Sequence, residues 1–252
     1  EEINNLRNLS KKTLKLDKEK GYAKYDDSDQ KSVYYTIGDL LIKPLRTLLM
    51  DKRIIEIATK IIGEKPVYFG ESNYQVGVGD RGFHRDSVDE VLNGKSTREY
   101  GVGPDWSDEY KIIRIGVYLQ DHHKFSGGVK FEKGSHKLPF NNRTRVFADT
   151  RAGDVVVWDL RTYHSGNSVR LKVFPNLPMG CRIENILPEF LIRKEQSLRM
   201  SCFMVFGKES KYLDRHIEKH YKIKFKEYMK IQKYSDDILK KCKDSNFKVI
   251  IP

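Results

Sequence analysis

Apolar residues recur at helical spacing in the first quarter of the chain. Between residues 40 and 62 they return every three or four positions, until Gly63 ends the run. The pattern predicts one or two amphipathic helices, whose apolar positions are Leu40, Leu41, Leu45, Leu48, Leu49, Ile54, Ile55, Ile57, Ala58, Ile61 and Ile62. The first 30 residues are instead dense in Lys, Asp, Glu and Asn with little apolar periodicity, so we expect a surface arm with sparse packing.

Short strand-like runs replace the helical pattern between residues 67 and 206. Gly, Asn, Asp and Pro separate these runs, a rhythm that is typical of a β-sandwich or barrel. The clearest predicted strands span residues 112–119, 129–132, 154–158 and 198–206.

Helical spacing returns between residues 210 and 242, in a strongly basic segment. It predicts one helix packed on the sheet with its lysines in solvent, and its apolar stripe is Leu213, Ile217, Tyr221, Phe225, Tyr228 and Ile231. No internal repeat or low-complexity linker divides the chain. We therefore predict one domain over residues 1–252, mainly β with flanking α-helices. Its parts are an arm and helices (1–66), a β core (67–206) and a C-terminal helical segment (207–252).

Composition and charge narrow the class of protein. Hydrophobic residues make up 38% of the chain and charged residues 33%, and the formal net charge is +12. Such a charge suits an acidic partner, but the lysines are spread over both ends, so a nucleic-acid partner is open and not favoured. No apolar stretch approaches a membrane span. The three cysteines form no CxxC pair, and we expect a reducing, cytoplasmic setting.

A His-Arg-Asp triplet is the first sign of chemistry. On an extended strand His84 and Asp86 point to the same face, so both can reach one ion. His164 follows a hydrophobic strand that opens with Gly153-Asp154, and it can complete the set from a neighbouring strand. Two histidines and one carboxylate on one face of an ion are the ligands expected for non-haem iron(II). From the residues alone, His84, Asp86 and His164 are candidate metal ligands and the candidate catalytic centre, and a surface His and Asp without a metal are the alternative.

A late strand carries the candidate anchor for an organic acid. Alternation puts Arg199, Ser201, Phe203 and Val205 on one face, with Met200, Cys202, Met204 and Phe206 on the other. A guanidinium can bind a carboxylate through two hydrogen bonds and a neighbouring hydroxyl can add a third, which suits the distal carboxylate of 2-oxoglutarate.

Two further residues are candidates for the cofactor-binding cavity. Arg114 and Tyr118 are an even number of residues apart in one predicted strand, so they share a face that could look into a barrel. Packing is the alternative role for both.

In order along the chain, several motifs together resemble the phytanoyl-CoA dioxygenase family. They are His84-Arg85-Asp86, the run Ile115-Gly116-Val117-Tyr118-Leu119-Gln120-Asp121, Gly127-Gly128, Lys133-Gly134-Ser135-His136-Lys137, the Gly153-Asp154 strand with His164, and Arg199. The resemblance implies a double-stranded β-helix, a cupin-like jelly-roll, that couples substrate oxidation to decarboxylation of 2-oxoglutarate to succinate. It also implies that His84, Asp86 and His164 are the metal ligands and that Arg199 anchors the cosubstrate. By the same resemblance, His136 is a structural loop residue and not a ligand. We expect His122 and His123 to be loop residues too.

One spacing departs from the family. Arg199 follows His164 by 35 positions, whereas family members carry this arginine much closer to the distal histidine. We interpret residues 168–196 as an insertion near the mouth of the active site. Arg170 is the alternative anchor, although the residues around it show no comparable strand that pairs Arg with Ser.

Three classes of function follow from these residues. The first is a hydroxylase of a small molecule, lipid, or phosphate- or carboxylate-bearing metabolite that uses iron(II), 2-oxoglutarate and O2, with ascorbate as a further candidate. The second is a demethylase or hydroxylase of nucleic acid or protein with the same iron site and a basic groove. The third is a jelly-roll without catalysis. The first predicts an enclosed pocket under the insertion, and the second predicts a positive groove leading to the metal.

Overall fold

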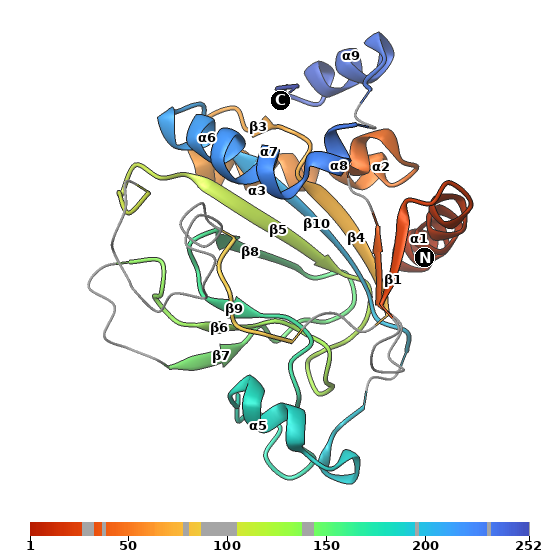
Figure 1. Ribbon diagram of the computed structural model, residues 1–252, viewed down its shortest axis with the longest axis vertical. Helices are drawn as coiled ribbons and strands as arrows, with labels where there is room; N and C mark the ends of the chain where they lie inside the picture. Colours follow the sequence, from red (N-terminus) through yellow and green to blue (C-terminus); the bar gives the residue numbers. More distant parts are fainter. Residues whose placement is uncertain are drawn as a thin grey trace.

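Two β-sheets form the centre of the computed structural model, and helices flank them (Figure 1). The structure describes residues 1–26, 33–36, 39–77, 81–86, 105–137, 144–194, 197–230 and 233–251. Within these residues the protein is mainly β with flanking α-helices, as the sequence predicts. None of the described helices combines the length and the apolar character that a bilayer crossing requires.

Strand β10 (Met200–Gly207) lies at the centre of the larger sheet. It pairs antiparallel with β4 (Ser72–Gly77) on one side and with β5 (Ile112–Tyr118) on the other, and β5 pairs in turn with β8 (Val155–Asp159). The other strands of this sheet are β1 (Ala23–Asp26), β2 (Val33–Thr36), β3 (Val67–Tyr68) and β11 (Lys248–Val249). The predicted strands at 112–119, 154–158 and 198–206 are thus confirmed within two residues at each end.

The smaller sheet places strand β6 (Lys130–Glu132) between β7 (Arg145–Phe147) and β9 (His164–Ser165). Its β6 confirms the predicted strand at 129–132. His84 forms an antiparallel bridge with His164, so the segment 81–86 continues this sheet beyond β9. The two sheets lie on opposite sides of a central space, with β5 and β10 above β6 and β9 in Figure 1.

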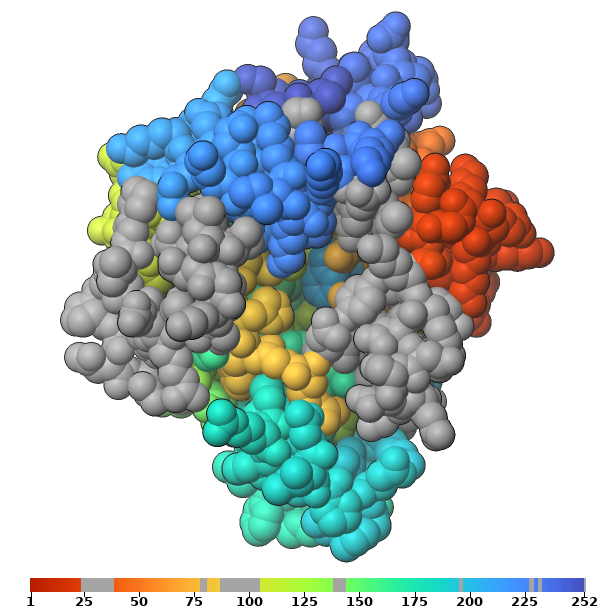
Figure 2. Space-filling view, in the orientation of Figure 1, coloured from red at the N-terminus to blue at the C-terminus, as the bar shows by residue number. Residues whose placement is uncertain are grey.

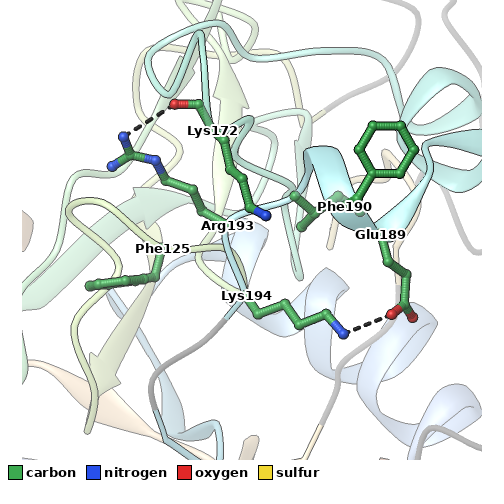
Figure 3. Close-up of a pocket in the computed structure, with 7 residues that line it drawn as sticks. Phe125, Lys172, Glu189, Phe190, Arg193 and Lys194 are labelled. Carbon is green, nitrogen blue, oxygen red and sulfur yellow. Dashed lines mark hydrogen bonds and ion pairs between the residues drawn. The ribbon is translucent and has the colours of Figure 1, made fainter.

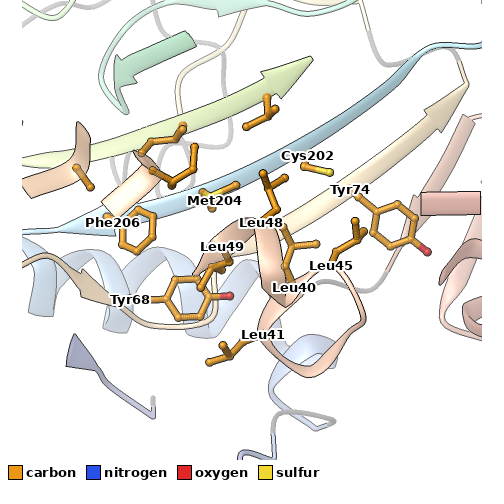
Figure 4. Packing of buried hydrophobic residues seen from close by; sticks show 14 of the residues in the cluster. Leu40, Leu41, Leu45, Leu48, Leu49, Tyr68, Tyr74, Cys202, Met204 and Phe206 are labelled. Atoms are coloured by element: carbon orange, nitrogen blue, oxygen red, sulfur yellow. The ribbon is translucent and has the colours of Figure 1, made fainter. Parts of the chain in front are cut away.

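The outer face of β10 is buried under the N-terminal helices (Figure 4). These are η1 (Leu40–Ile42), α2 (Arg46–Leu49) and α3 (Lys52–Ile62), which confirm the helices predicted between residues 40 and 62. The Asp51 side chain accepts a hydrogen bond at the start of α3, and Gly63 ends it at a φ of 88°. Each buried Leu or Ile contributes roughly 1.5–3 kcal/mol. Because Met200, Cys202, Met204 and Phe206 pack against these helices, the opposite side chains of β10 face the space between the sheets.

The predicted N-terminal arm is wrong for residues 2–19, which form the helix α1 (Glu2–Glu19). Leu14 joins the main core, and Asp17 forms a buried ion pair with Lys43 at 2.5 Å. The polar residues Ser10 and Thr13 lie on the buried face, where their hydroxyl groups donate to the carbonyls of Leu6 and Leu9. Because these polar residues interrupt the apolar stripe of α1, the spacing of apolar residues does not predict this helix. Residues 27–30 of the predicted arm lie outside the described residues.

The single helix predicted for residues 210–242 is also wrong. The structure has α6 (Lys211–His216), a π-helical turn η3 (Ile217–Tyr221), α7 (Lys222–Lys224), α8 (Lys226–Met229) and α9 (Asp236–Asp244). A new helix begins at Ser235, whose hydroxyl accepts from the Ile238 amide. The packing on the sheet is confirmed, because Leu213, Ile217 and Tyr221 join a second buried cluster with Val205. Ile231 and the side chain of Tyr228 lie outside the described residues.

The long connection between β9 and β10 has structure of its own. It holds helix α5 (Cys181–Ile186) and the short helix η2 (Glu189–Leu191), and a bridge between Leu171 and Ile192 closes it at its base. Glu184 of α5 forms a fully buried ion pair with Lys130 of β6. This pair attaches the connection to the smaller sheet.

Candidate metal centre

The structure brings His84, Asp86 and His164 together between the two sheets. The Asp86 carboxylate lies 3.8 Å from His84 Nε2 through one oxygen and 3.4 Å from His164 Nε2 through the other. One ligand atom from each residue lies within 4.8 Å of the other two. Asp86 and His164 are buried, whereas 41% of the His84 side chain is exposed. The cluster is therefore accessible at His84.

Backbone hydrogen bonds place these three residues. His84 and His164 exchange both of their main-chain bonds, at 2.9 and 3.0 Å, and the Asp86 amide donates to the carbonyl of Leu160 at 3.0 Å. The segment 82–86 is thus an extended strand with His84 and Asp86 on one face. Pairing of this segment with β9 supplies the third side chain.

The imidazole rings are oriented by carbonyl groups two residues earlier in the chain. His84 Nδ1 lies 3.0 Å from the Gly82 oxygen, and His164 Nδ1 lies 2.9 Å from the Thr162 oxygen. A carbonyl oxygen can only accept, so each Nδ1 carries the proton and donates it. Each Nε2 then keeps its lone pair and faces Asp86, which is the arrangement found when histidines bind metal ions.

The protonation states of the buried pair also suit a metal ion. Burial opposes ionisation of Asp86, but Arg114 together with His164, His84 and Lys224 outweighs it, so the pKa of Asp86 is held below its usual range. Burial lowers the pKa of His164 to about 3, which keeps that imidazole neutral. Within the described residues, Asp86 Oδ2 makes no hydrogen bond, although Arg114 Nη1 lies 3.0 Å away. An ionised carboxylate and neutral imidazoles are the forms that bind a divalent cation. The three residues therefore fit such an ion.

A cavity of about 260 Å³ opens at the cluster. In Figure 2 the molecule is hollowed between the C-terminal segment above (blue) and the insertion below (teal). The described residues that line the cavity are Asn73, Gln75, His84, Asp86, Arg114, Tyr118, Val129, Trp158, His164, Gly166, Arg199, Phe203, Lys224 and Phe225. They include Lys224 and Phe225 from the C-terminal segment and none from residues 168–194. The predicted pocket under the insertion stays a prediction, because residues 195–196 of the insertion lie outside the described residues.

Arg199 lies at the start of β10 and is only 2% exposed. Its Nε donates to the Gly127 carbonyl at 2.8 Å, and its Nη1 donates to Gln75 Oε1 at 2.9 Å. These bonds hold the guanidinium against the cavity wall. Ser201, the other half of the predicted anchor, pairs with Tyr118 and Gln75 of the neighbouring strands. Its Oγ is buried without a hydrogen bond in the described part of the chain, and it is absent from the cavity lining.

Arg114 and Tyr118 both line the cavity, on the face that the sequence indicated. Arg114 lies between two acidic residues and contacts both. Its Nη2 lies 2.6 Å from Glu71 Oε1, and its Nη1 contacts Asp86 Oδ2. Burial raises the pKa of Tyr118 to about 12, so its phenol keeps the proton. The Tyr118 ring packs edge-on against Phe203.

The alternative residues lie elsewhere. Arg170 forms an ion pair with Asp149 and donates to the Pro175 carbonyl, and it is outside the described cavity lining. The ring nitrogens of His122 contact Gln120 and Ser126. His123 pairs with Asp149, and His136 belongs to neither cluster of possible metal ligands among the described residues. The geometry thus favours Arg199 over Arg170.

Sequence reasoning missed Lys224, Phe225 and Glu71. The first two belong to a segment interpreted as a packing helix, and Glu71 precedes β4 without any motif around it. No local signal marks these positions: Lys224 and Phe225 reach the cavity through the packing of the C-terminal segment on the larger sheet, and Glu71 lines a small adjacent pocket.

A second, larger pocket of about 670 Å³ lies in the insertion (Figure 3). Phe125, Lys172, Glu189, Phe190, Ile192, Arg193 and Lys194 line it. Lys194 pairs with Glu189 at 2.7 Å, and Arg193 donates to the Lys172 carbonyl at 3.2 Å. The two pockets share no described lining residue. The basic character of this pocket is therefore separate from the candidate metal centre.

Solved structures share this arrangement of sheets and helices. AviO1 from Streptomyces viridochromogenes Tue57 is 18% identical over 82% of this chain and 85% of its own, with a TM-score of 0.50. SnoK, a non-heme alpha ketoglutarate dependent carbocyclase from nogalamycin biosynthesis, is 18% identical over 85% of this chain and 81% of its own, with a TM-score of 0.52. The chain shares their fold.

A further similar structure, EvdMO1, is 18% identical over 83% of this chain and 45% of its own, with a TM-score of 0.52. Comparison with models of protein families finds no match, and comparison with curated protein sequences finds none. At these identities the similarity concerns the fold, and the function has to be argued from the site.

Proposed function

We propose that the chain is an iron(II)- and 2-oxoglutarate-dependent dioxygenase that hydroxylates a C–H bond of a small molecule. One observation carries the proposal: His84 Nε2, His164 Nε2 and the carboxylate of Asp86 converge in a cavity whose wall holds Arg199. Two histidines and one carboxylate leave positions of an octahedral ion open, as iron(II) oxygenases require. The shared fold with SnoK supports the same class.

The strand order supports a double-stranded β-helix of the type implied by the resemblance to phytanoyl-CoA dioxygenases. One sheet has the order β4-β10-β5-β8, and the other has the segment 81–86 followed by β9, β6 and β7. In this arrangement the ligand residues lie at one end of the smaller sheet, and Arg199 faces them from the start of β10. From β4 to β10, consecutive strands thus alternate between the two sheets, except for β6 and β7, which share the smaller sheet.

In this proposal His84, Asp86 and His164 hold the iron, and Arg199 binds the distal carboxylate of 2-oxoglutarate. Iron(II), when bound, supplies the centre at which O2 and 2-oxoglutarate react. The bonds from Arg199 to Gly127 and Gln75 orient its guanidinium before the cosubstrate arrives. Ser201 is a weaker candidate for the same carboxylate, because it lies behind the described lining.

Two neighbouring residues have supporting roles. Arg114 keeps Asp86 ionised and oriented through the contact at 3.0 Å. Tyr118 keeps its proton, so it can donate a hydrogen bond to an anionic cosubstrate without losing it. Phe203, Trp158 and Val129 are apolar parts of the wall, and they exclude water from the place where a C–H bond would react.

The size of the cavity favours a small substrate. About 260 Å³ corresponds to roughly nine water molecules at about 30 Å³ each, which is enough for the cosubstrate and the reacting end of a metabolite. Lys224 is a cation in the wall and would attract a carboxylate or phosphate on that metabolite. A basic groove for nucleic acid has less support, because the basic pocket of the insertion shares no described residue with this cavity.

Anaerobic titration tests the proposal. Adding iron(II) and then 2-oxoglutarate to the metal-free protein should produce a metal-to-ligand charge-transfer band in the visible range, and exposure to O2 should produce succinate. His84→Ala should abolish the band. His136→Asn, a change at a histidine outside both candidate clusters, is the matched control and should leave the band intact. A folded protein that gives neither band nor succinate would contradict the proposal.

A further inference from the structure

Glu71, His216 and His220 form a second cluster of metal-binding groups, apart from the candidate iron site. Glu71 directly precedes β4, His216 ends α6, and His220 lies in the π-helical turn η3. One ligand atom from each lies within 4.8 Å of the other two, and the three residues are at most 2% exposed. The proposed iron site uses none of them.

The two histidines leave most of their ring nitrogens without partners. His216 Nε2 lies 2.8 Å from Glu71 Oε2. By contrast, His216 Nδ1 and both ring nitrogens of His220 are buried without a hydrogen bond to any described residue. Folded proteins seldom leave buried polar groups unsatisfied, because such groups have lost their bonds to water. Three unsatisfied nitrogens beside one carboxylate indicate a ligand that is bound there.

The local backbone directs both rings to the same place. His216 and His220 are four residues apart, so they lie on one side of the helix. Their rings stack with centroids 4.6 Å apart and an angle of 22°. Phe69 packs edge-on against His216, and Phe225 packs against His220. The π-helical geometry of residues 217–221 is of a kind that often occurs at functional sites.

The charges of the cluster suit a cation. Glu71 supplies the negative charge, and its two oxygens lie 2.6 Å from Arg114 Nη2 and 2.8 Å from His216 Nε2. A neutral imidazole carries one N–H and one lone pair, and the lone pair can bind a cation. A carboxylate beside two imidazoles is therefore a ligand set for a divalent metal ion.

We propose that Glu71, His216 and His220 bind a zinc ion. Two histidines and one glutamate are an established ligand set for zinc, with a water molecule in the fourth position, and zinc needs no redox chemistry. The ion would attach the C-terminal segment to the start of β4. Since Arg114 contacts Glu71 at 2.6 Å and Asp86 at 3.0 Å, the zinc site would also fix the cation that orients a proposed iron ligand.

The experiment separates the two sites by substitution. His84→Ala combined with His164→Ala removes the proposed iron ligands, and the metal-free double variant is titrated with zinc(II) and with cobalt(II). We expect one equivalent to bind, with visible cobalt absorption bands and a higher melting temperature. Adding His220→Asn should abolish binding, whereas adding His136→Asn should not. Absence of zinc binding by the folded double variant would overturn the proposal, as would binding that survives His220→Asn.

A second measurement identifies the zinc ligands directly. X-ray absorption at the zinc edge, recorded on the His84→Ala, His164→Ala double variant loaded with one equivalent of zinc, should show two imidazoles around zinc, which in this variant cannot come from the proposed iron site. A zinc spectrum without imidazole ligands would contradict the site. The iron and 2-oxoglutarate band is independent of this result, so the failure of one proposal is distinguishable from the failure of the other.

Discussion

Arg114 Nη1 lies 3.0 Å from Asp86 Oδ2, which is the buried carboxylate oxygen that has no hydrogen bond among the described residues. The charge of Arg114 holds the pKa of Asp86 low, and the guanidinium plane also fixes the side chain beside the two histidines. Arg114 is thus placed to control the geometry of the candidate iron site without being one of its ligands.

Replacing Arg114 should weaken iron binding. Arg114→Lys keeps a positive charge but loses the fork that contacts both Asp86 and Glu71, so iron(II) affinity should fall by about 10- to 100-fold, the usual effect of losing a residue that orients a ligand. Equilibrium titration with iron(II) under anaerobic conditions measures this. Arg53→Lys, at an exposed arginine, is the control. Equal affinity in both variants would show that Asp86 does not depend on Arg114.

The two candidate anchors for 2-oxoglutarate should behave differently when substituted. Arg199→Met should raise the KM for 2-oxoglutarate by roughly 10- to 100-fold, because a charge-assisted hydrogen bond contributes about 1.5–3 kcal/mol. Arg170→Met should leave that KM within about twofold, since Arg170 is committed to Asp149 and Pro175. Succinate production at varied 2-oxoglutarate concentration gives both values. A larger rise of this KM in Arg170→Met than in Arg199→Met would make Arg170 the anchor for 2-oxoglutarate.

The attachment of α1 should depend on one buried ion pair. Asp17→Ala leaves the ammonium of Lys43 buried without its partner and also removes the acceptor of the Tyr74 hydroxyl. We expect a loss of about 3–5 kcal/mol in the free energy of unfolding. Urea denaturation measures it. Glu2 lies on α1 with Asp17 and forms an exposed ion pair with Arg53 of α3. Glu2→Ala breaks this pair and should change the free energy of unfolding little. Similar losses of unfolding free energy in the two variants would contradict the special role of the buried pair.

His122 should make the stability of the metal-free protein depend on pH. Burial lowers its pKa to about 4, against about 6.5 in the unfolded chain. The unfolded state therefore binds more protons between these two values. The stability that neutral His122 provides is complete above pH 6.5 and is lost as the pH falls towards 4. Between pH 7 and pH 5 the loss is about 2 kcal/mol.

Urea denaturation at pH 7 and at pH 5 tests the role of His122. In His122→Gln the loss between the two pH values should be smaller than in the unsubstituted protein by about 2 kcal/mol. The other buried histidines titrate in both proteins, so the difference isolates His122. An identical loss in the two proteins would show that another group is responsible.

Local patterns were sufficient for much of the fold. The alternation along 198–206 predicted which side chains of β10 enter the main core, because neighbouring side chains in a strand point to opposite faces. Helical spacing with Gly63 predicted the N-terminal helices, since a glycine at positive φ ends a helix irrespective of tertiary context. The same local rule placed His84 and Asp86 on one face of an extended segment.

What the sequence determined by itself is therefore local: the type of most strands and helices, and which of their residues share a face. The sequence also predicted that His164 joins His84 and favoured Arg199 over Arg170, but only the tertiary structure supplies the contacts that bring them to one cavity. It alone decided that residues 2–19 form a helix. It also decided that Glu71 meets His216 and His220. These outcomes depend on contacts between residues far apart in the chain, which arise when buried faces pack together and which no local pattern of residues encodes.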